Sequence, residues 1–259
     1  MMSGRRSTAK RLADNILASG LLLLLCLAAG CSHGRMRPPV DHRQLLADSQ
    51  LRYQQARSPY RASGTMSVSG QGYRHRFGVQ LRWESPGRAR LDLTGPLGLT
   101  LASAAATDTA AWLSVPWYGY FARGTLAGLD SSAAATLGLS LDTFFKFVEG
   151  WPPLDLDREC SILEKKGLVE YLYEYSDTTI AVSLDRGSGD LVSLSVRAGA
   201  KDLLEVVYGD FRAFGPGRRP YDISIASPAS GAKLTIDFDT VKPVQNFPPE
   251  TWLPPEGKR

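Results

Sequence analysis

Side chains that could act as a general base, a nucleophile or a metal ligand are few in this sequence of 259 residues. The histidines are His33, His42 and His75. His33 and His42 precede the predicted strands, which leaves His75 alone for a Ser–His–Asp or Cys–His site. Asp155, Asp157 and Glu159 alternate in a Pro-rich connection, a pattern more typical of a solvated loop than of a metal site. P-loop, dinucleotide-binding and CxxC motifs are absent. The sequence therefore predicts no catalytic residue, no metal and no cofactor, and it favours binding over enzymatic activity.

Cys31 is the side chain whose setting predicts a specific reaction. Basic residues between Arg5 and Arg11 precede an apolar run centred on Leu21 to Leu25, which closes with Leu27-Ala28-Ala29-Gly30-Cys31. This order is typical of an export signal. The run is shorter than the ~20 apolar residues that span a bilayer. A thiol directly after Ala-Gly is the acceptor for a diacylglycerol, so we expect a lipoprotein signal at residues 1–30 and lipid on Cys31. An ordinary secretory signal or a signal anchor is the alternative.

The predicted lipid anchor indicates where the protein works. Two or three acyl chains are more than stable anchoring requires. Ser32, and not Asp, follows the cysteine, and the sorting rule for such lipoproteins then implies transfer to the outer membrane. We expect residues 31–41, which are small, polar and basic, to be a flexible tether for a periplasmic domain.

Charge and cysteine content restrict the partners. The net charge of +4 owes much to the signal, so the mature chain is near neutral and a nucleic-acid partner is not indicated. We expect Cys26 to be lost with the signal and Cys31 to be acylated, so Cys160 has no partner for a disulfide within the mature chain. For Cys160 a buried, inert thiol is favoured over a reactive one. Arg218 and Arg219 lie in a turn rich in Gly and Pro, which we expect to be solvated. The alternative is that these two arginines contact anionic lipid head groups.

A period of two after Ser58-Pro59 predicts an antiparallel sheet. Apolar and polar residues alternate from Tyr73 to Trp83, and a turn at Ser85-Pro86-Gly87 leads into a second strand, Arg88 to Thr94. Further strands are expected at 62–69, 99–105, 110–115, 118–123, 168–175, 178–184, 191–197, 203–211, 221–226 and 233–241. About eleven strands result, or twelve if every one of these segments pairs as a separate strand, and either number is too many for an open sheet to stay flat.

Helical patterns are confined to two places. The segment His42 to Arg57 predicts an amphipathic N-terminal helix. Leu141, Phe144, Phe145 and Val148 have i, i+3, i+4 and i+7 spacing, which predicts an apolar helix that ends at Gly150. Because this helix must bury its stripe, we expect it to act as a lid or plug on the curled sheet. Residues 246–259 are a Pro-rich tail that is not assigned to the core.

The segment Trp83 to Gly98 (WESPGRARLDLTGPLG) resembles the LolB-like outer-membrane lipoproteins of the LolA/LolB superfamily. It has that family's Trp, glycine-bearing turn, Arg-x-Leu-x-Leu-Thr strand and Pro-Leu-Gly loop. Weaker likenesses occur at Phe144 to Pro152 and at Val206 to Phe211. The resemblance implies that residues 42–245 form a mainly β domain, an incomplete (unclosed) antiparallel β-barrel with a helical lid. Pro116 to Phe121, the Pro-rich tail and the basic tether depart from the family, which leaves a paralogous role open.

The resemblance also implies where an acyl chain would bind. The expected cavity residues are Phe77, Val79, Leu81, Trp83, Leu91, Leu93, Phe144, Phe145 and Val148. The alternative is that these side chains fill a dry core, because a period of two indicates burial and not empty volume. The loop Pro96, Leu97, Gly98 and Leu99 is expected to help insert cargo into the membrane, with Leu97 exposed. The alternative for Leu97 is a turn back into the core.

From these residues we expect an outer-membrane lipoprotein that binds acyl chains. Its expected partners are the outer membrane through covalent lipid, acylated lipoproteins as cargo, and a LolA-like periplasmic carrier that delivers them to a monomer. No nucleotide is needed, because acyl chains move according to relative affinity. The alternative is a structural or assembly lipoprotein whose filled barrel serves as a protein-binding platform.

Overall fold

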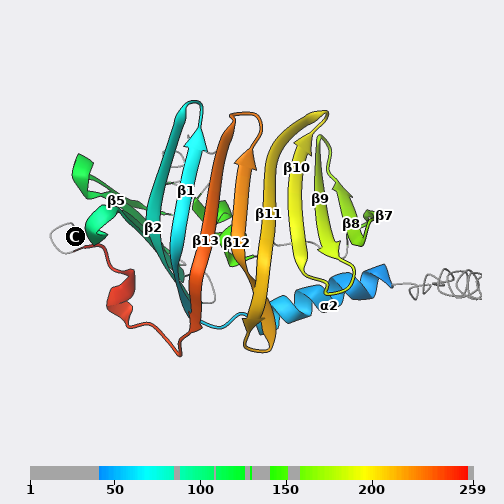
Figure 1. Cartoon of the computed structure of the whole chain (residues 1–259), viewed down its shortest axis with the longest axis horizontal. Helices are drawn as coiled ribbons and strands as arrows, with labels where there is room; N and C mark the ends of the chain where they lie inside the picture. Colours follow the sequence, from blue (N-terminus) through cyan, green and yellow to red (C-terminus); the bar gives the residue numbers. More distant parts are fainter. Residues whose placement is uncertain are drawn as a thin grey trace, which may run out of the picture. The chain divides into compact units, whose positions relative to one another are not determined.

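The computed structural model describes residues 41–84, 88–107, 109–125, 129, 141–150 and 158–255 (Figure 1). The predicted signal sequence, Cys31 and the tether up to residue 40 lie outside the described residues, as do the turn at residues 85–87 and the carboxylates Asp155 and Asp157. Residues 41–259 form one compact unit. Within the described part of the chain, no helix combines the length and the apolar composition needed to cross a bilayer.

Thirteen strands of the described residues form one antiparallel sheet, in the order β6-β5-β4-β3-β2-β1-β13-β12-β11-β10-β9-β8-β7. The strands are β1 (Tyr60–Gly70), β2 (Tyr73–Glu84), β3 (Arg88–Thr94), β4 (Thr100–Ala106), β5 (Ala111–Val115), β6 (Tyr120–Gly124), β7 (Ser161–Lys165), β8 (Leu168–Glu174), β9 (Thr178–Asp185), β10 (Leu191–Ala198), β11 (Lys201–Phe214), β12 (Gly217–Ser227) and β13 (Ala232–Pro243). Since β6 and β7 are the two edges, the sheet is not closed into a barrel, as the sequence predicts.

The sheet consists of two meanders that meet at one pairing. Strands β1 to β6 and strands β7 to β13 each pair with their neighbours in the sequence, and β1 pairs with β13. The pairing of β1 with β13 runs from Tyr60 opposite Pro243 to Ser69 opposite Lys233. A register shift interrupts it between Ser63 and Gly64, where a Cβ on Gly64 would lie 2.0 Å from the carbonyl oxygen of Asp237. The close backbone approach therefore requires glycine at this position.

The sheet contains more strands than the sequence predicts. Each expected segment is a strand, with ends that differ by a few residues, and β7 is an additional strand. In β7 only Ile162 is even partly buried, so this edge strand lacks the alternation of apolar and polar residues that identifies a strand. Pairing with β8 defines β7, and pairing partners are not visible in local sequence.

Two helices accompany the sheet in the described residues. Helix α2 (His42–Gln55) begins at Asp41, whose side chain accepts hydrogen bonds from the backbone N–H groups of Arg43 and Gln44. It runs along the lower ends of β9 to β11 in Figure 1, and the Ser49 hydroxyl donates to the carbonyl of Gly189 there. Helix α4 (Leu141–Glu149) lies in the connection between the two meanders and ends at Gly150, which has a positive φ of 93°.

One face of the sheet, called the inner face below, carries the hydrophobic core. This core joins both meanders, Leu46 of α2 and four side chains of α4 (Phe144, Phe145, Phe147 and Val148). The rings of Trp83 and Phe145 are in edge-to-face contact with centroids 6.5 Å apart. Helix α4 therefore buries its apolar stripe against the inner face, which is the lid-or-plug arrangement expected for an apolar helix next to a curled sheet.

The opposite, outer face is covered in part by the C-terminal segment. Residues Pro249–Trp252 form a 3-10 helix, η3, and Trp252 is buried. The indole N–H of Trp112 donates to the carbonyl of Trp252 over 2.8 Å, and the Arg90 guanidinium donates to the carbonyl of Thr251 over 2.9 Å. The Pro-rich tail, which the sequence does not assign to the core, thus includes a buried tryptophan in the part up to residue 255.

Candidate functional site

The predicted acyl-chain residues gather in one cluster on the inner face. Seven of them are buried: Val79, Leu81, Trp83, Leu91, Phe144, Phe145 and Val148. Phe77 and Leu93 are partly buried and pack against the same cluster. Strands β2 and β3 position the first group because Val79 pairs with Leu93 and Leu81 pairs with Leu91, so their side chains share a face. The structure therefore brings all nine residues together.

Two polar atoms of the hydrophobic core on the inner face have no hydrogen-bond partner within the described residues. The indole N–H of Trp83 and the hydroxyl of Tyr208 are both buried without a hydrogen bond there. Burial raises the pKa of the Tyr208 hydroxyl, so it stays protonated and remains a donor at neutral pH. Buried donors in a close-packed core are usually satisfied. Two unsatisfied donors on the inner face are therefore the feature that a polar-ended ligand or a water molecule would explain.

The predicted insertion loop is a 3-10 turn, η1 (Pro96–Gly98), that joins β3 to β4. Leu97 is 96% exposed, and Leu99 is exposed as well. Leu97 has a φ of 68°, a left-handed conformation that is unfavourable for leucine. The backbone is nevertheless closed by a hydrogen bond from Gly95 N–H to the Leu99 carbonyl over 2.9 Å. The alternative in which Leu97 turns back into the core is wrong.

The segment that departs from the LolB-like pattern forms a second exposed turn. Residues Pro116–Tyr118 are a 3-10 turn, η2, between β5 and β6. Trp117 is 69% exposed and Tyr118 is 87% exposed. In the sequence this segment departs from the LolB-like pattern, and no role is predicted for it.

The remaining candidates for chemistry are two histidines and a cysteine on different elements. His75 is exposed and stacks between Tyr73 and Phe77, with ring centroids 5.9 and 6.2 Å away. His42 lies 3.2 Å from a carboxylate oxygen of Glu164 at the start of α2. Cys160 is half-buried, whereas the sequence favours a buried thiol. Among the described residues, no group of three or more His, Cys, Asp and Glu side chains is arranged to hold a metal ion.

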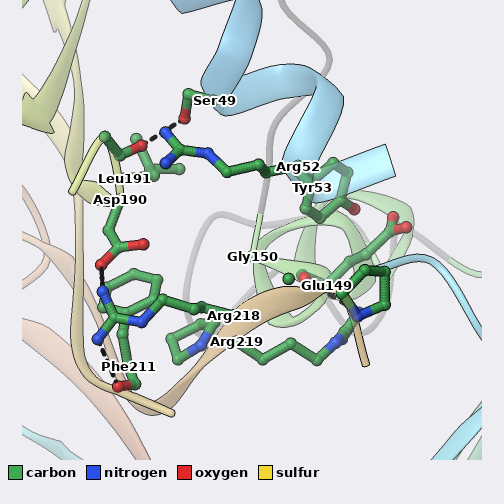
Figure 2. Close-up of a pocket in the computed structure, with 14 residues that line it drawn as sticks. Ser49, Arg52, Tyr53, Glu149, Gly150, Asp190, Leu191, Phe211, Arg218 and Arg219 are labelled. Atoms are coloured by element: carbon green, nitrogen blue, oxygen red, sulfur yellow. Dashed lines mark hydrogen bonds and ion pairs between the residues drawn. The ribbon is translucent and has the colours of Figure 1, made fainter. Parts of the chain in front are cut away.

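A pocket of about 200 Å³ lies where α2 meets the turns before β10 and β12 (Figure 2). Its walls include Arg52, Glu149, Arg218 and Arg219. Arg218 is paired with Asp190 and also donates to the Phe211 carbonyl over 2.7 Å. The charges that line the pocket are thus partly neutralised within it.

For Arg219 the predicted solvated turn is wrong. This residue is only 4% exposed, and its guanidinium carbon lies 3.9 Å from the centroid of the Tyr60 ring. A Coulombic and stacking contact with the ring replaces water around the cation. Sequence reasoning missed this because Tyr60 and Phe214, the rings that enclose Arg219, are brought to it only by the folded sheet.

No protein-family model matches the chain, and no curated protein matches its sequence. Solved structures do match it. A DUF1329 family protein from Desulfovibrio piger has a TM-score of 0.60 at 10% identity, over 83% of this chain and 98% of the other. An outer membrane lipoprotein-sorting protein domain, so described, from Vibrio parahaemolyticus has a TM-score of 0.58 at 10% identity, over 81% and 95%. A LolA superfamily protein from Nitrosomonas europaea has a TM-score of 0.53 at 12% identity, over 83% and 99%.

The chain has the LolA/LolB fold. At sequence identities of 10–12%, these matches show a shared fold and nothing about function. The LolA/LolB fold agrees with the resemblance that the sequence shows from Trp83 to Gly98, whereas the narrower assignment to LolB-like lipoproteins stays a prediction.

Proposed function

We propose that this protein is an outer-membrane lipoprotein that binds acyl chains on the inner face of its LolA/LolB fold. In this proposal it is anchored through lipid on Cys31, receives acylated lipoproteins from a LolA-like periplasmic carrier, and inserts them into the outer membrane. It acts as a monomer and catalyses no reaction.

The observation that carries the proposal is the apolar cluster on the inner face, which an unclosed sheet and α4 surround. Burial of each CH₂ of an acyl chain in such a cluster would contribute about 0.8 kcal/mol. The unsatisfied donors of Trp83 and Tyr208 favour a ligand over a filled core, because a polar group of the ligand, such as an ester carbonyl, could accept a hydrogen bond from either donor. The edges β6 and β7 do not pair with each other, so a gap in the backbone hydrogen bonding exists through which a chain could enter.

Binding of a fatty acid that carries a fluorophore tests the inner face directly. The test uses residues 41–259, the compact unit that contains the whole sheet and its core. We expect saturable binding, and we expect Leu93→Trp to weaken it by about tenfold or more because the added ring occupies the space of the chain. The matched control is Leu163→Trp on β7, where the side chain is exposed and a larger ring displaces nothing.

The outcome also decides between the two readings of the cluster. If the folded wild-type unit binds no acyl probe, the inner face is a filled core, and the protein is then better explained as a protein-binding platform. If Leu93→Trp and Leu163→Trp weaken binding equally, the probe binds elsewhere on the protein.

Insertion is tested separately with Leu97→Glu. A triacylated lipoprotein is offered on its periplasmic carrier, and its incorporation into phospholipid vesicles is followed. We expect the variant to receive cargo normally but to insert it more slowly, because a charged side chain at the loop tip resists entry into the bilayer. Leu51→Glu on α2, another exposed leucine, is the control. Normal insertion by Leu97→Glu would show that η1 is not an insertion loop.

A further inference from the structure

The turns η1 and η2 lie at the same edge of the sheet although about twenty residues separate them along the chain. Strand β4 begins at Thr100 directly after η1, and β5 ends at Val115 directly before η2. These two strands are antiparallel neighbours, with Ser103 opposite Ser114, so the beginning of β4 lies beside the end of β5. Both turns therefore project from one corner of the first meander, beside the strand labelled β5 in Figure 1.

This corner gathers large apolar side chains in contact with solvent. They are Leu97, Leu99, Trp117, Tyr118 and Tyr120. Other exposed large apolar residues of the described chain, such as Leu51, Leu163 and Leu203, occur on α2, β7 and β11. Single exposed leucines are normal on a protein surface, but a contiguous group that includes Trp marks a surface that another phase or molecule covers.

The two turns are held in these conformations by their own backbone. The N–H of Gly98 donates to the Gly95 carbonyl over 3.2 Å, and the N–H of Gly119 donates to the Pro116 carbonyl over 3.0 Å. Gly119 has a positive φ of 60°, and each turn begins with a proline whose φ is restricted. Exposure of these side chains is therefore a property of the folded state and does not result from a loose loop.

The charge around the corner indicates what covers it. Residues 95–99 and 115–120 contain no charged side chain. Thr94, at the end of β3, pairs with Gly78 of β2. At this edge β2 extends past Gly78, and the extension carries the exposed residues Arg74 and Arg76. Neither arginine forms an ion pair within the described part of the chain. An uncharged aromatic surface beside unpaired cations is complementary to a bilayer with anionic head groups.

We propose that η1 and η2 together form one bilayer-contact surface, in which Trp117 and Tyr118 lie at the level of the phospholipid head groups and Leu97 reaches the acyl region. Trp and Tyr favour that interfacial level because each has an apolar ring and a polar hydrogen-bonding group. Two contact turns fix the orientation of the domain on the membrane, whereas one turn would leave it free to rotate. This inference rests on the proposed membrane location but not on acyl-chain binding.

Quenching of tryptophan fluorescence by brominated phospholipids tests the contact. The full chain is reconstituted into vesicles of phosphatidylethanolamine and phosphatidylglycerol that contain lipid brominated along the acyl chains. The wild type and Trp117→Phe share every other tryptophan, which are Trp83, Trp112, Trp151 and Trp252. Three of these, Trp83, Trp112 and Trp252, are also buried. Subtracting the emission spectrum of Trp117→Phe from that of the wild type therefore isolates the emission of Trp117. We expect this difference emission to be quenched, and we expect the quenching to be lost in Tyr118→Ser when it also carries Leu97→Ser.

The control is Leu163→Ser, which removes an exposed leucine from β7 and should leave the quenching of Trp117 unchanged. Unquenched Trp117 in protein held on the same vesicles would overturn the inference. It would also be overturned if Trp117→Phe dissociated a dimer detected by light scattering while bromolipid had no effect, because the surface would then pair two copies. Acyl-probe binding is measured on the same proteins, so loss of that activity is distinguishable from loss of bilayer contact.

Discussion

Asp92 is a buried acid on the outer face of the sheet. Its carboxylate accepts hydrogen bonds from Ser103 over 2.7 Å and from Arg90 over 3.1 Å, and Arg82 donates to it as well. Burial by itself raises the pKa of Asp92, but the hydrogen bonds of Arg90 and Ser103 outweigh that effect and the pKa is lowered. The ionised form is therefore the one that stabilises the fold.

Asp92→Asn is expected to lower the free energy of unfolding at neutral pH by about 2 kcal/mol, because hydrogen bonds to a charged acceptor are lost. The pKa of Asp92 is lower in the folded state than in the unfolded state, so its contribution is present above the ordinary carboxyl pKa of about 4 and is lost as the pH falls through the folded value. Urea denaturation at several pH values should show the difference between wild type and variant narrowing in acid.

Asp202→Asn provides the comparison for Asp92, because Asp202 pairs with Arg197 on the surface with both side chains exposed. Exposed pairs contribute little to stability. Equal losses of stability in the two variants would show that the hydrogen bonds around Asp92 are not worth more than a surface ion pair.

The side chains of the inner face could be predicted from the sequence, whereas Asp92, Glu149 and Arg219 could not. Val79, Leu81 and Trp83 follow a period of two, which is a local signal. A buried charge, by contrast, is tolerated only where its partners are supplied by other elements. Arg90, a partner of Asp92, is local because it lies two residues earlier on β3, but Arg82 and Ser103 come from β2 and β4. The rings around Arg219 come from β1 and β11. No local pattern therefore indicates the complete set of partners.

At the scale of elements, α4 is fixed to the rest of the domain by its last residue. Glu149 is buried, and its carboxylate accepts a hydrogen bond from Arg57 over 2.7 Å, in the connection from α2 to β1. That hydrogen bond raises the pKa of the Arg57 guanidinium. Burial, followed by the negative charge of Glu149, raises the pKa of the nearby Tyr53 hydroxyl. The lid is thus held by a charge pair as well as by its apolar stripe.

Arg57→Ala is expected to destabilise the domain by about 2–3 kcal/mol, because it removes the cation that faces a buried carboxylate. Hydrogen exchange of Arg57→Ala and of the wild type should be compared. We expect the substitution to accelerate exchange of the α4 amides more than exchange of the strand amides, because the lid opens locally. Lys146→Ala is the matched control, because Lys146 pairs with Asp142 on the exposed side of the same helix. If Arg57→Ala left α4 protected while the whole domain lost stability, the pair would stabilise the sheet and not the lid.

Elements differ in how well the sequence predicts them. Long strands with one buried face, such as β2 and β11, are recognisable, while the exposed edge strand β7 is not. The burial of the C-terminal segment is also not predictable from its own sequence. Its prolines indicate an extended chain correctly, but the burial of Trp252 depends on Arg90 and Trp112, which lie on strands far away in the sequence.

For the molecule as a whole, stability depends on the pairing of β1 with β13. Gly64→Ala would place a Cβ 2.0 Å from the Asp237 carbonyl oxygen and 2.7 Å from the Phe238 Cα, so the backbone of this pairing must shift. We expect a loss of about 2–3 kcal/mol in chemical denaturation. Gly209→Ala on β11 is the control, because its Cβ would meet no atom closer than 3.5 Å. Equal stability of the two variants would mean that the pairing adjusts without cost.

The joining of the two meanders also has a consequence for how the chain folds. Every other pairing in the sheet joins two strands that follow each other in the sequence. By contrast, β13 must pair with β1 although the chain from Tyr60 to Pro243 separates their far ends. Contacts of large sequence separation slow folding. The rate-limiting search is therefore expected at this pairing, and until it ends both strands present unpaired edges. Newly exported chains would be most prone to pair with one another during that interval.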